Sequence, residues 1–238
     1  MSTKPTIVLI HGAFADAGSW APVAKILLDQ GYTVRVPGSP NRSLLGDAAY
    51  IRSVVEHIDG PVLLAGHSYG GAIITIAGDA DNVVGLVYVA GYALDENETL
   101  NQLQGGFPDS DLATKLVLTP FPIEGAEDGT DVTVVVEDFP AIFAAGVDPE
   151  TAKLFSVSQR PLAAVAFGQP APVAAWKTKP AWGIVSSADH TINPDVERFG
   201  YKRAGFRKVI ELDAPHLVMQ THPADVAGLI AEAATEVE

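Results

Sequence analysis

The chain has 238 residues, of which 47% are hydrophobic and 18% charged, a composition typical of a globular protein with a sizeable core. Its net charge of −14 argues against partners such as nucleic acid or anionic lipid, which require clustered Lys and Arg. The absence of cysteine excludes disulfides, thiolate catalysis and cysteine-based metal sites.

Short runs rich in β-branched residues alternate with longer stretches of helical periodicity, which is the pattern of a parallel sheet covered by helices. Several runs are almost entirely apolar, as strands buried on both faces are. The predicted strands are residues 6–10, 32–36, 61–65, 83–89, 181–186 and 207–212. The predicted helices are residues 19–30 with Ser19 as N-cap, 47–58, 69–78 and about 223–235. The sequence therefore predicts an α/β fold with a mostly parallel six-stranded sheet flanked by helices.

The alternation stops between the fourth and fifth predicted strands, which are separated by roughly 90 residues instead of the usual 4–6. This stretch is rich in Gly and Pro, contains a candidate hairpin with residues 130–136 as one strand, and carries ten acidic residues against one Lys between residues 109 and 150. We expect residues 1–91 and 181–238 to form one core domain. Residues 92–180 are then a cap inserted over the carboxyl edge of the sheet, where open α/β sheets bind ligands.

The strongest chemical signal is the pattern Gly-x-Ser-x-Gly at residues 66–70, between an apolar strand and an apolar helix. The chain reverses so sharply there that side chains at the two glycines would collide with the backbone. Ser68 is thereby exposed at the sheet edge, beside the positive end of a helix. No dinucleotide fingerprint, phosphate-binding loop or His-Glu-x-x-His pattern is present, so we expect neither a cofactor nor a metal.

A serine hydroxyl needs a general base, and His216 is the predicted base because its loop follows the last predicted strand. Asp189 follows the fifth predicted strand and is the predicted acid that orients the imidazole. Asp195, at a predicted helix start, and Asp95, after the fourth strand, are the alternative acids. Each of these loops leaves the sheet at the same carboxyl edge as Ser68.

The other histidines have sequence contexts that fit other roles. His11 is interpreted as a buried imidazole bonded to loop backbone, and His67 as a side chain that points into the fold. His57 lies on a helix on the wrong side of the sheet, and His222 is expected at a helix start. His190 directly follows the predicted acid.

An acyl-transfer site also needs donors for the oxyanion of the tetrahedral intermediate. The turn after the first strand and the start of the helix after Ser68 supply them, so we predict the backbone N–H groups of Ala13 and Tyr69. Phe14 is the alternative to Ala13 if the turn is offset by one residue. Phe14 and Tyr92, which follow the first and fourth strands, are the predicted substrate contacts.

These motifs together resemble those of the small α/β-hydrolase esterases, namely plant methyl esterases with their hydroxynitrile lyase relatives and bacterial pyrethroid-hydrolase-like carboxylesterases. The resemblance rests on His11-Gly12-Ala13, residues 66–71, Ala188-Asp189 and residues 215–219, and it spans nearly the whole core. It implies the α/β-hydrolase fold and a triad of Ser68, Asp189 and His216 in the chain order of that fold. Hydroxynitrile lyases of this group carry a threonine and a lysine where this chain has Gly12 and Leu217, which argues against lyase chemistry.

The predicted function is hydrolysis of a small, largely apolar carboxylic ester through an acyl-enzyme. The alternatives on the same triad are a carbon–carbon bond hydrolase, a hydroxynitrile lyase-like enzyme or a cofactor-free oxygenase, and the non-enzymatic alternative is a ligand-binding sensor. The expected partner is a small molecule, and homodimer formation stays open. No apolar run approaches the ~20 residues of a membrane span, and residues 6–10 are too short for a signal peptide, so we expect a soluble, cytoplasmic protein.

Overall fold

A computed structural model describes residues 4–237. Its main sheet has six strands in the order β2-β1-β3-β4-β8-β9, and every neighbouring pair is parallel. The strands are β1 (Thr6–Ile10), β2 (Val34–Arg35), β3 (Val62–His67), β4 (Val83–Val89), β8 (Ala181–Ser186) and β9 (Lys208–Leu212). The prediction of an α/β fold with a parallel six-stranded sheet is confirmed.

The strands β2 and β3 differ most from their predicted bounds, for physical reasons. β2 is shorter than residues 32–36, because it is an edge strand that pairs only with β1 over Val34 and Arg35. β3 continues past residue 65, since Gly66 and His67 pair with the end of β4. The strand therefore runs directly up to Ser68.

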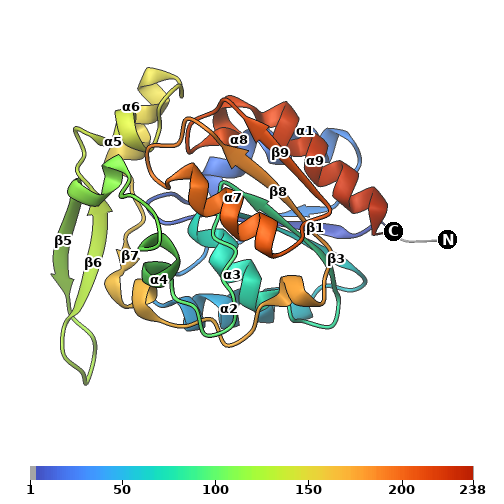
Figure 1. The fold of residues 1–238 in the computed structure, drawn as a ribbon, viewed down its shortest axis with the longest axis horizontal. Coiled ribbons are helices and arrows are strands. Elements are labelled where there is room, and N and C mark those ends of the chain that lie inside the picture. Colours follow the sequence, from blue (N-terminus) through green and yellow to red (C-terminus); the bar gives the residue numbers. More distant parts are fainter. Residues whose placement is uncertain (1–3, 238) are drawn as a thin grey trace.

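Helices cover both faces of the sheet, with α1 and α9 on one side and α2 and α3 on the other (Figure 1). The principal helices are α1 (Ala21–Asp29), α2 (Leu44–Glu56), α3 (Tyr69–Ala77), α7 (Pro194–Arg203) and α9 (Pro223–Glu236). The prediction of Ser19 as the N-cap of the first helix is wrong. A 3-10 turn, Ala17–Trp20, precedes α1 and is capped by Asp16, while Ser19 is buried within that turn.

The helix α2 begins three residues earlier than predicted. The hydroxyl of Ser43 accepts a hydrogen bond from the N–H of Gly46 and so caps the helix before residue 47. Asp47 consequently lies within the first turn of α2, where its buried carboxylate can reach the neighbouring α3.

The insertion between β4 and β8 contains a second, antiparallel sheet with the order β5-β6-β7. Its elements are α4 (Leu100–Gln104), β5 (Leu116–Phe121), β6 (Gly129–Val134), α5 (Phe139–Ile142), α6 (Pro149–Val157), β7 (Leu162–Ala163) and short 3-10 turns. The hairpin β5–β6 corresponds to the candidate hairpin around residues 130–136. It lies at the end of the molecule opposite the C-terminal end of α9 (Figure 1).

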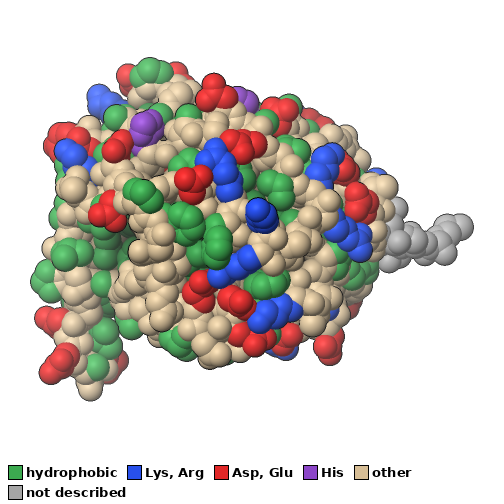
Figure 2. All heavy atoms as spheres, viewed as in Figure 1, with side chains coloured by type: hydrophobic (Ala, Val, Ile, Leu, Met, Phe, Trp, Pro, Cys, Tyr) green, Lys and Arg blue, Asp and Glu red, His purple; other side chains and the backbone are tan. Residues whose placement is uncertain are grey.

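The surface carries acidic and basic side chains close to one another rather than in separate patches on the face drawn in Figure 2. Ion pairs between α7 and its neighbours, such as Arg198 with Glu211, account for part of this mixing. Within residues 4–237, no helix has the length and apolar character that crossing a membrane requires.

Candidate active site

Ser68 occupies a strained turn between β3 and α3. Its φ of 55° and ψ of −122° are unfavourable for a residue with a side chain, and only tight packing maintains them. A Cβ on Gly66 would lie 2.4 Å from the carbonyl oxygen of Gly70, and one on Gly70 would lie 2.5 Å from that of Ile10. The two glycines are therefore required by the close approach of the backbone segments.

A further glycine, Gly12, brings the turn after β1 against the serine. A Cβ at Gly12 would be 2.8 Å from the Cβ of Ser68 and 3.1 Å from the carbonyl oxygen of His67. The sequence pattern marked Gly12 as part of the motif after the first strand and as a difference from hydroxynitrile lyases, but it did not predict this contact. The turn can approach Ser68 closely only because residue 12 has no side chain.

His216 and Asp189 form a fully buried pair at the same edge of the sheet. The Nδ1 atom of His216 lies 2.6 Å from Oδ2 of Asp189, and both side chains have no solvent exposure. The other carboxylate oxygen, Oδ1, accepts the N–H groups of Thr191 at 2.6 Å and Ile192 at 2.9 Å. These contacts fix the carboxylate and aim one oxygen at the imidazole.

The imidazole of His216 lies beside the strained turn between β3 and α3, the elbow, that holds Ser68. Its ring centroid is 4.6 Å from that of His67, and Nε2 of His67 is 2.9 Å from the carbonyl oxygen of His216. Phe143 also packs against the imidazole, at 4.9 Å between ring centroids. Nε2 of His216 is buried and has no hydrogen-bond partner within residues 4–237. This nitrogen is thus available as a proton acceptor.

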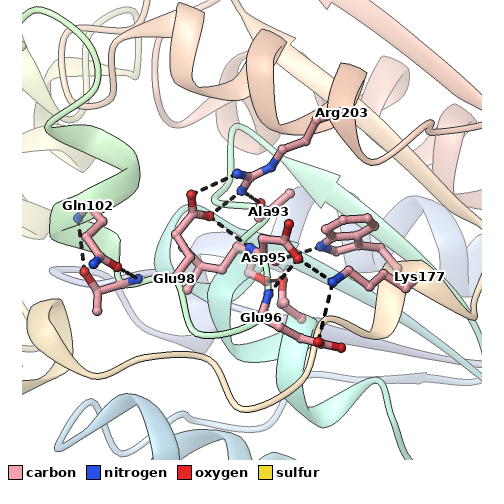
Figure 3. A network of polar contacts seen from close by, with 12 residues as sticks. Ala93, Asp95, Glu96, Glu98, Gln102, Lys177 and Arg203 are labelled. Atoms are coloured by element: carbon pink, nitrogen blue, oxygen red, sulfur yellow. Dashed lines mark hydrogen bonds and ion pairs between the residues drawn. The ribbon is translucent and has the colours of Figure 1, made fainter.

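The two alternative acids are engaged elsewhere. Asp195 lies in the first turn of α7 and pairs with Arg198 at 2.7 Å. Asp95 accepts from Lys177 at 2.6 Å in the network drawn in Figure 3. Both carboxylates are partly exposed, whereas that of Asp189 is buried against the imidazole.

The remaining histidines occupy positions that agree with their sequence contexts. His11 is buried between the carbonyl oxygen of Gly12 and a backbone N–H, while His57 ends α2 and is exposed. His190 is an exposed partner of an aspartate, and His222 directly precedes α9. Burial lowers the pKa of His67 well below the usual value, and the neighbouring His216 lowers it further.

The backbone donors predicted for the oxyanion differ in their availability. The N–H of Phe14 donates to the carbonyl oxygen of Arg160 at 3.0 Å, so this alternative is already bonded. In the part of the chain that the structure describes, the N–H groups of Ala13 and Tyr69 have no acceptor. They can therefore donate to a bound oxygen.

Tyr69 is anchored by a contact that the sequence analysis did not predict. Its hydroxyl donates to Oδ2 of Asp47 at 2.7 Å, and both side chains are buried. Burial raises the pKa of Asp47, although its hydrogen bonds with Tyr69 and with backbone N–H groups oppose the shift. Since Asp47 lies in the first turn of α2 and Tyr69 is the first residue of α3, this bond ties the residue after Ser68 to a neighbouring helix.

A cavity of about 490 Å³, part of it open to solvent, adjoins Ser68. Phe14 and Tyr92, the two predicted substrate contacts, both line it together with Ala13 and Tyr69. Most of the remaining lining is apolar and comes from the insertion and the loop after β8: Leu100, Gln104, Leu112, Ala113, Leu116, Leu162, Phe167, Thr191 and Ile192. None of the lining side chains is charged.

One end of this cavity is formed by α4, and a polar network fixes the loop before that helix (Figure 3). Arg203 donates to both carboxylate oxygens of Glu98 and to the carbonyl oxygen of Ala93. Thr99 then caps α4 in a capping box with Gln102. The network links α7 to α4 and so determines where α4 lies relative to the sheet.

A positive charge for a carboxylate or phosphate substrate is not found at the cavity. Lys177 pairs with Asp95 and Glu96 (Figure 3), and the guanidinium of Arg160 donates to the carbonyl oxygen of Pro40. Within residues 4–237, no group of His, Asp and Glu side chains is arranged to hold a metal ion.

Comparisons with known proteins match the chain to one family and to solved structures of the same fold. The sequence profile of the alpha/beta hydrolase family matches residues 7–229. No curated protein sequence matches the chain significantly. Among solved structures, polyneuridine aldehyde esterase superimposes with a TM-score of 0.83 at 17% identity, over 97% of this chain and 99% of that one.

Two other similar structures carry related names. A pyrethroid hydrolase from Sphingobium faniae JZ-2 has a TM-score of 0.75 at 22% identity and covers 98% of each chain. A methylesterase from Arabidopsis has a TM-score of 0.79 at 16% identity, over 98% of this chain and 99% of that one. At these identities the similarity establishes a shared fold.

Proposed function

The chain belongs to the alpha/beta hydrolase family, and from this premise we propose that it is a serine hydrolase that cleaves a small, largely apolar carboxylic ester. The observation that carries the proposal is the buried pair of His216 and Asp189, 2.6 Å apart, beside the strained turn at Ser68. The names of the similar structures, which include an esterase and a methylesterase, agree with this reaction class.

In the first half of the proposed reaction, the Ser68 hydroxyl attacks the ester carbonyl carbon while Nε2 of His216 takes its proton. Asp189 accepts the Nδ1–H of the imidazole and stabilises its protonated form. The oxyanion receives hydrogen bonds from the N–H groups of Ala13 and Tyr69. The carbon–oxygen bond to the alcohol then breaks, and His216 gives its proton to the departing alkoxide.

The second half hydrolyses the acyl-enzyme. Water attacks the acyl carbon and gives a proton to His216, and the same two N–H groups bind the second oxyanion. Collapse breaks the bond to Ser68, whose oxygen regains the proton from His216. The products are an alcohol and a carboxylic acid, and the enzyme returns to its starting state.

We further propose that residues 92–180 act as a cap that determines the substrate. They supply the apolar side chains of Leu100, Leu112, Leu116, Leu162 and Phe167 to the cavity, together with Tyr92 and Gln104, which are bonded to each other. A neutral ester with a hydrophobic acyl part fits such a lining, because a buried charge without a partner would be costly.

The test is covalent labelling with a fluorophosphonate together with turnover of 4-nitrophenyl hexanoate. Ser68→Ala should abolish labelling and lower kcat by about 10⁶-fold, the factor for loss of a triad nucleophile. Ser187→Ala is a matched control, because that hydroxyl only donates to the carbonyl oxygen of Leu212. Persistent labelling or turnover in the Ser68 variant would refute the covalent mechanism.

A further inference from the structure

The polar groups of the cavity beside Ser68 are almost all bonded to the protein. Apart from the serine, its polar side chains are Tyr69, Tyr92, Gln104 and Thr191. The hydroxyl of Tyr69 donates to Asp47, and that of Thr191 donates to the carbonyl oxygen of Ile142 at 2.9 Å. Neither hydroxyl has its proton free for a ligand.

The third hydroxyl, that of Tyr92, orients the side chain of Gln104. It donates to Oε1 of Gln104 at 2.9 Å, so the carbonyl end of the amide faces the tyrosine. The amide –NH₂ group has no acceptor within residues 4–237. Apart from Ser68, the other side chains that line the cavity are apolar or already bonded, so Gln104 offers the cavity two further N–H donors.

The position of Gln104 places these donors on the substrate's path. Gln104 is the last residue of α4, and the network of Figure 3 holds the loop from which α4 starts. The residue lines both the cavity at Ser68 and a wider outer groove that includes Asn101 and Leu118. It thus stands where the cavity meets the groove.

The cavity is the side of the site that fits an acyl group. In the proposed reaction, the leaving alcohol takes its proton from His216 and must depart beside that imidazole. Phe143 and His67 pack against His216, which is not a lining residue of this cavity, whereas Ala13 and Tyr69 are. The part of the ester that stays on Ser68 is therefore the part that reaches Gln104.

We propose that Gln104 determines substrate specificity by donating a hydrogen bond to an acceptor oxygen in the acyl part of a neutral ester. The inference rests on the proposed ester hydrolysis and narrows its substrate class. An ether or carbonyl oxygen along the acyl chain accepts a hydrogen bond from the amide, while a purely hydrocarbon chain of the same length offers it no acceptor.

The experiment compares kcat/KM for three 4-nitrophenyl esters that differ only by exchange of CH₂ for oxygen: the hexanoate, the 4-methoxybutanoate and the 3-ethoxypropanoate. The readout is the ratio of the better ether ester to the hexanoate. Gln104→Met keeps the length of the side chain and removes its polarity. Gln104→Glu keeps an acceptor for the Tyr92 hydroxyl and removes the donors. Gln30→Met is the control, because it makes the same Gln-to-Met substitution at the exposed end of α1.

We expect the ratio to fall about five- to tenfold in both Gln104 variants, the factor that one hydrogen bond of typical net strength supplies. It should stay at the wild-type value in Gln30→Met. An unchanged ratio in Gln104→Met overturns the inference. The inference is also overturned if the ratio falls in Gln104→Met but keeps its wild-type value in Gln104→Glu, because residue 104 would then act through packing. Wild-type turnover of the hexanoate, lost in Ser68→Ala, supports the proposed function whatever the ratio is. If the wild type hydrolyses none of the three esters, that function fails and the inference fails with it.

Discussion

Replacing Asp189 by asparagine tests the proposed triad without changing the shape of the side chain. In the folded protein, Oδ1 of Asp189 accepts two backbone N–H groups and Oδ2 faces Nδ1 of His216. The amide introduced by Asp189→Asn must keep its carbonyl oxygen on the two N–H donors, since its own –NH₂ cannot accept them. The –NH₂ group then faces the imidazole.

This orientation forces the wrong tautomer on His216. Nδ1 has to accept a hydrogen bond from the amide, so the imidazole proton moves to Nε2, which can no longer take the proton of Ser68. The same exchange in a serine protease lowers kcat by about 10⁴-fold, equivalent to about 5.5 kcal/mol of activation free energy. The three hydrogen bonds survive, so the free energy of unfolding should fall by only about 1–2 kcal/mol.

The assay is kcat for 4-nitrophenyl hexanoate, with a thermal unfolding curve for each variant. Asp195→Asn and Asp95→Asn are matched controls, because these partly exposed carboxylates pair with Arg198 and Lys177. The kcat of each control should stay within about twofold of the wild-type value, because a surface substitution of this kind changes the free energy by about 0.5 kcal/mol or less. A folded Asp189→Asn enzyme within tenfold of wild type, or an inactive Asp95→Asn enzyme, would refute the assignment of the acid.

Three further predictions address the elbow, a buried carboxyl and the substrate. Gly66→Ala should destabilise the fold by at least about 1–3 kcal/mol, because the new Cβ would lie 2.4 Å from a carbonyl oxygen. The control Gly228→Ala in α9, where no atom lies within 4 Å of the new Cβ, should stabilise the fold by about 1 kcal/mol. Equal unfolding temperatures for the two variants would contradict this prediction. The pKa of Glu197 is raised well above its ordinary value of 4.5, mainly by burial of the carboxyl group and then by the negative charge of Asp189. The folded state thus binds the Glu197 proton more tightly than the unfolded state does. The stability that this difference contributes is lost as the pH rises above about 4.5, by at most about 1.4 kcal/mol per pH unit. The difference in unfolding free energy between wild type and Glu197→Gln should therefore decline between pH 5 and 8, and a constant difference would exclude the titration of Glu197 in this range. Finally, a neutral ester should have a higher kcat/KM than its analogue with a free carboxylate. Added salt should reduce this difference in kcat/KM, because it screens the protein's net charge of −14. A higher kcat/KM for the anionic ester at low salt would reveal an unassigned cation at the site.

The sequence predicted the features that depend on local pattern and chain order. Apolar runs located all six strands of the main sheet, and the glycines around Ser68 identified the elbow, because a strained turn restricts the residue types on either side of it. His216 and Asp189 followed from the rule that parallel strands end at one edge of the sheet. Their assignment as base and acid remains a prediction for the assays above.

Features that depend on contacts between distant segments were not predictable. The bond from Tyr69 to Asp47 joins two helices, and the pairing of Tyr92 with Gln104 needs the position of α4, which Arg203 sets from much later in the chain. Ser19 shows a local failure as well. It matched the residue preference of an N-cap, but Asp16 capped an earlier turn instead and left Ser19 buried.

Residues near the two ends of the insertion between β4 and β8 are hydrogen-bonded to each other. The N–H of Asn97 donates to the carbonyl oxygen of Ala171 at 2.7 Å, and the N–H of Ala171 donates to that of Glu98 at 3.0 Å. Trp176 adds a bond from its indole N–H to the carbonyl oxygen of Leu94 at 2.7 Å. A segment whose ends meet can change length at little entropic cost to the rest of the chain. The stretch between these bonded ends can therefore gain or lose residues with little effect on the main sheet, provided that the residues that contact the site, such as Phe143 and Arg160, are kept.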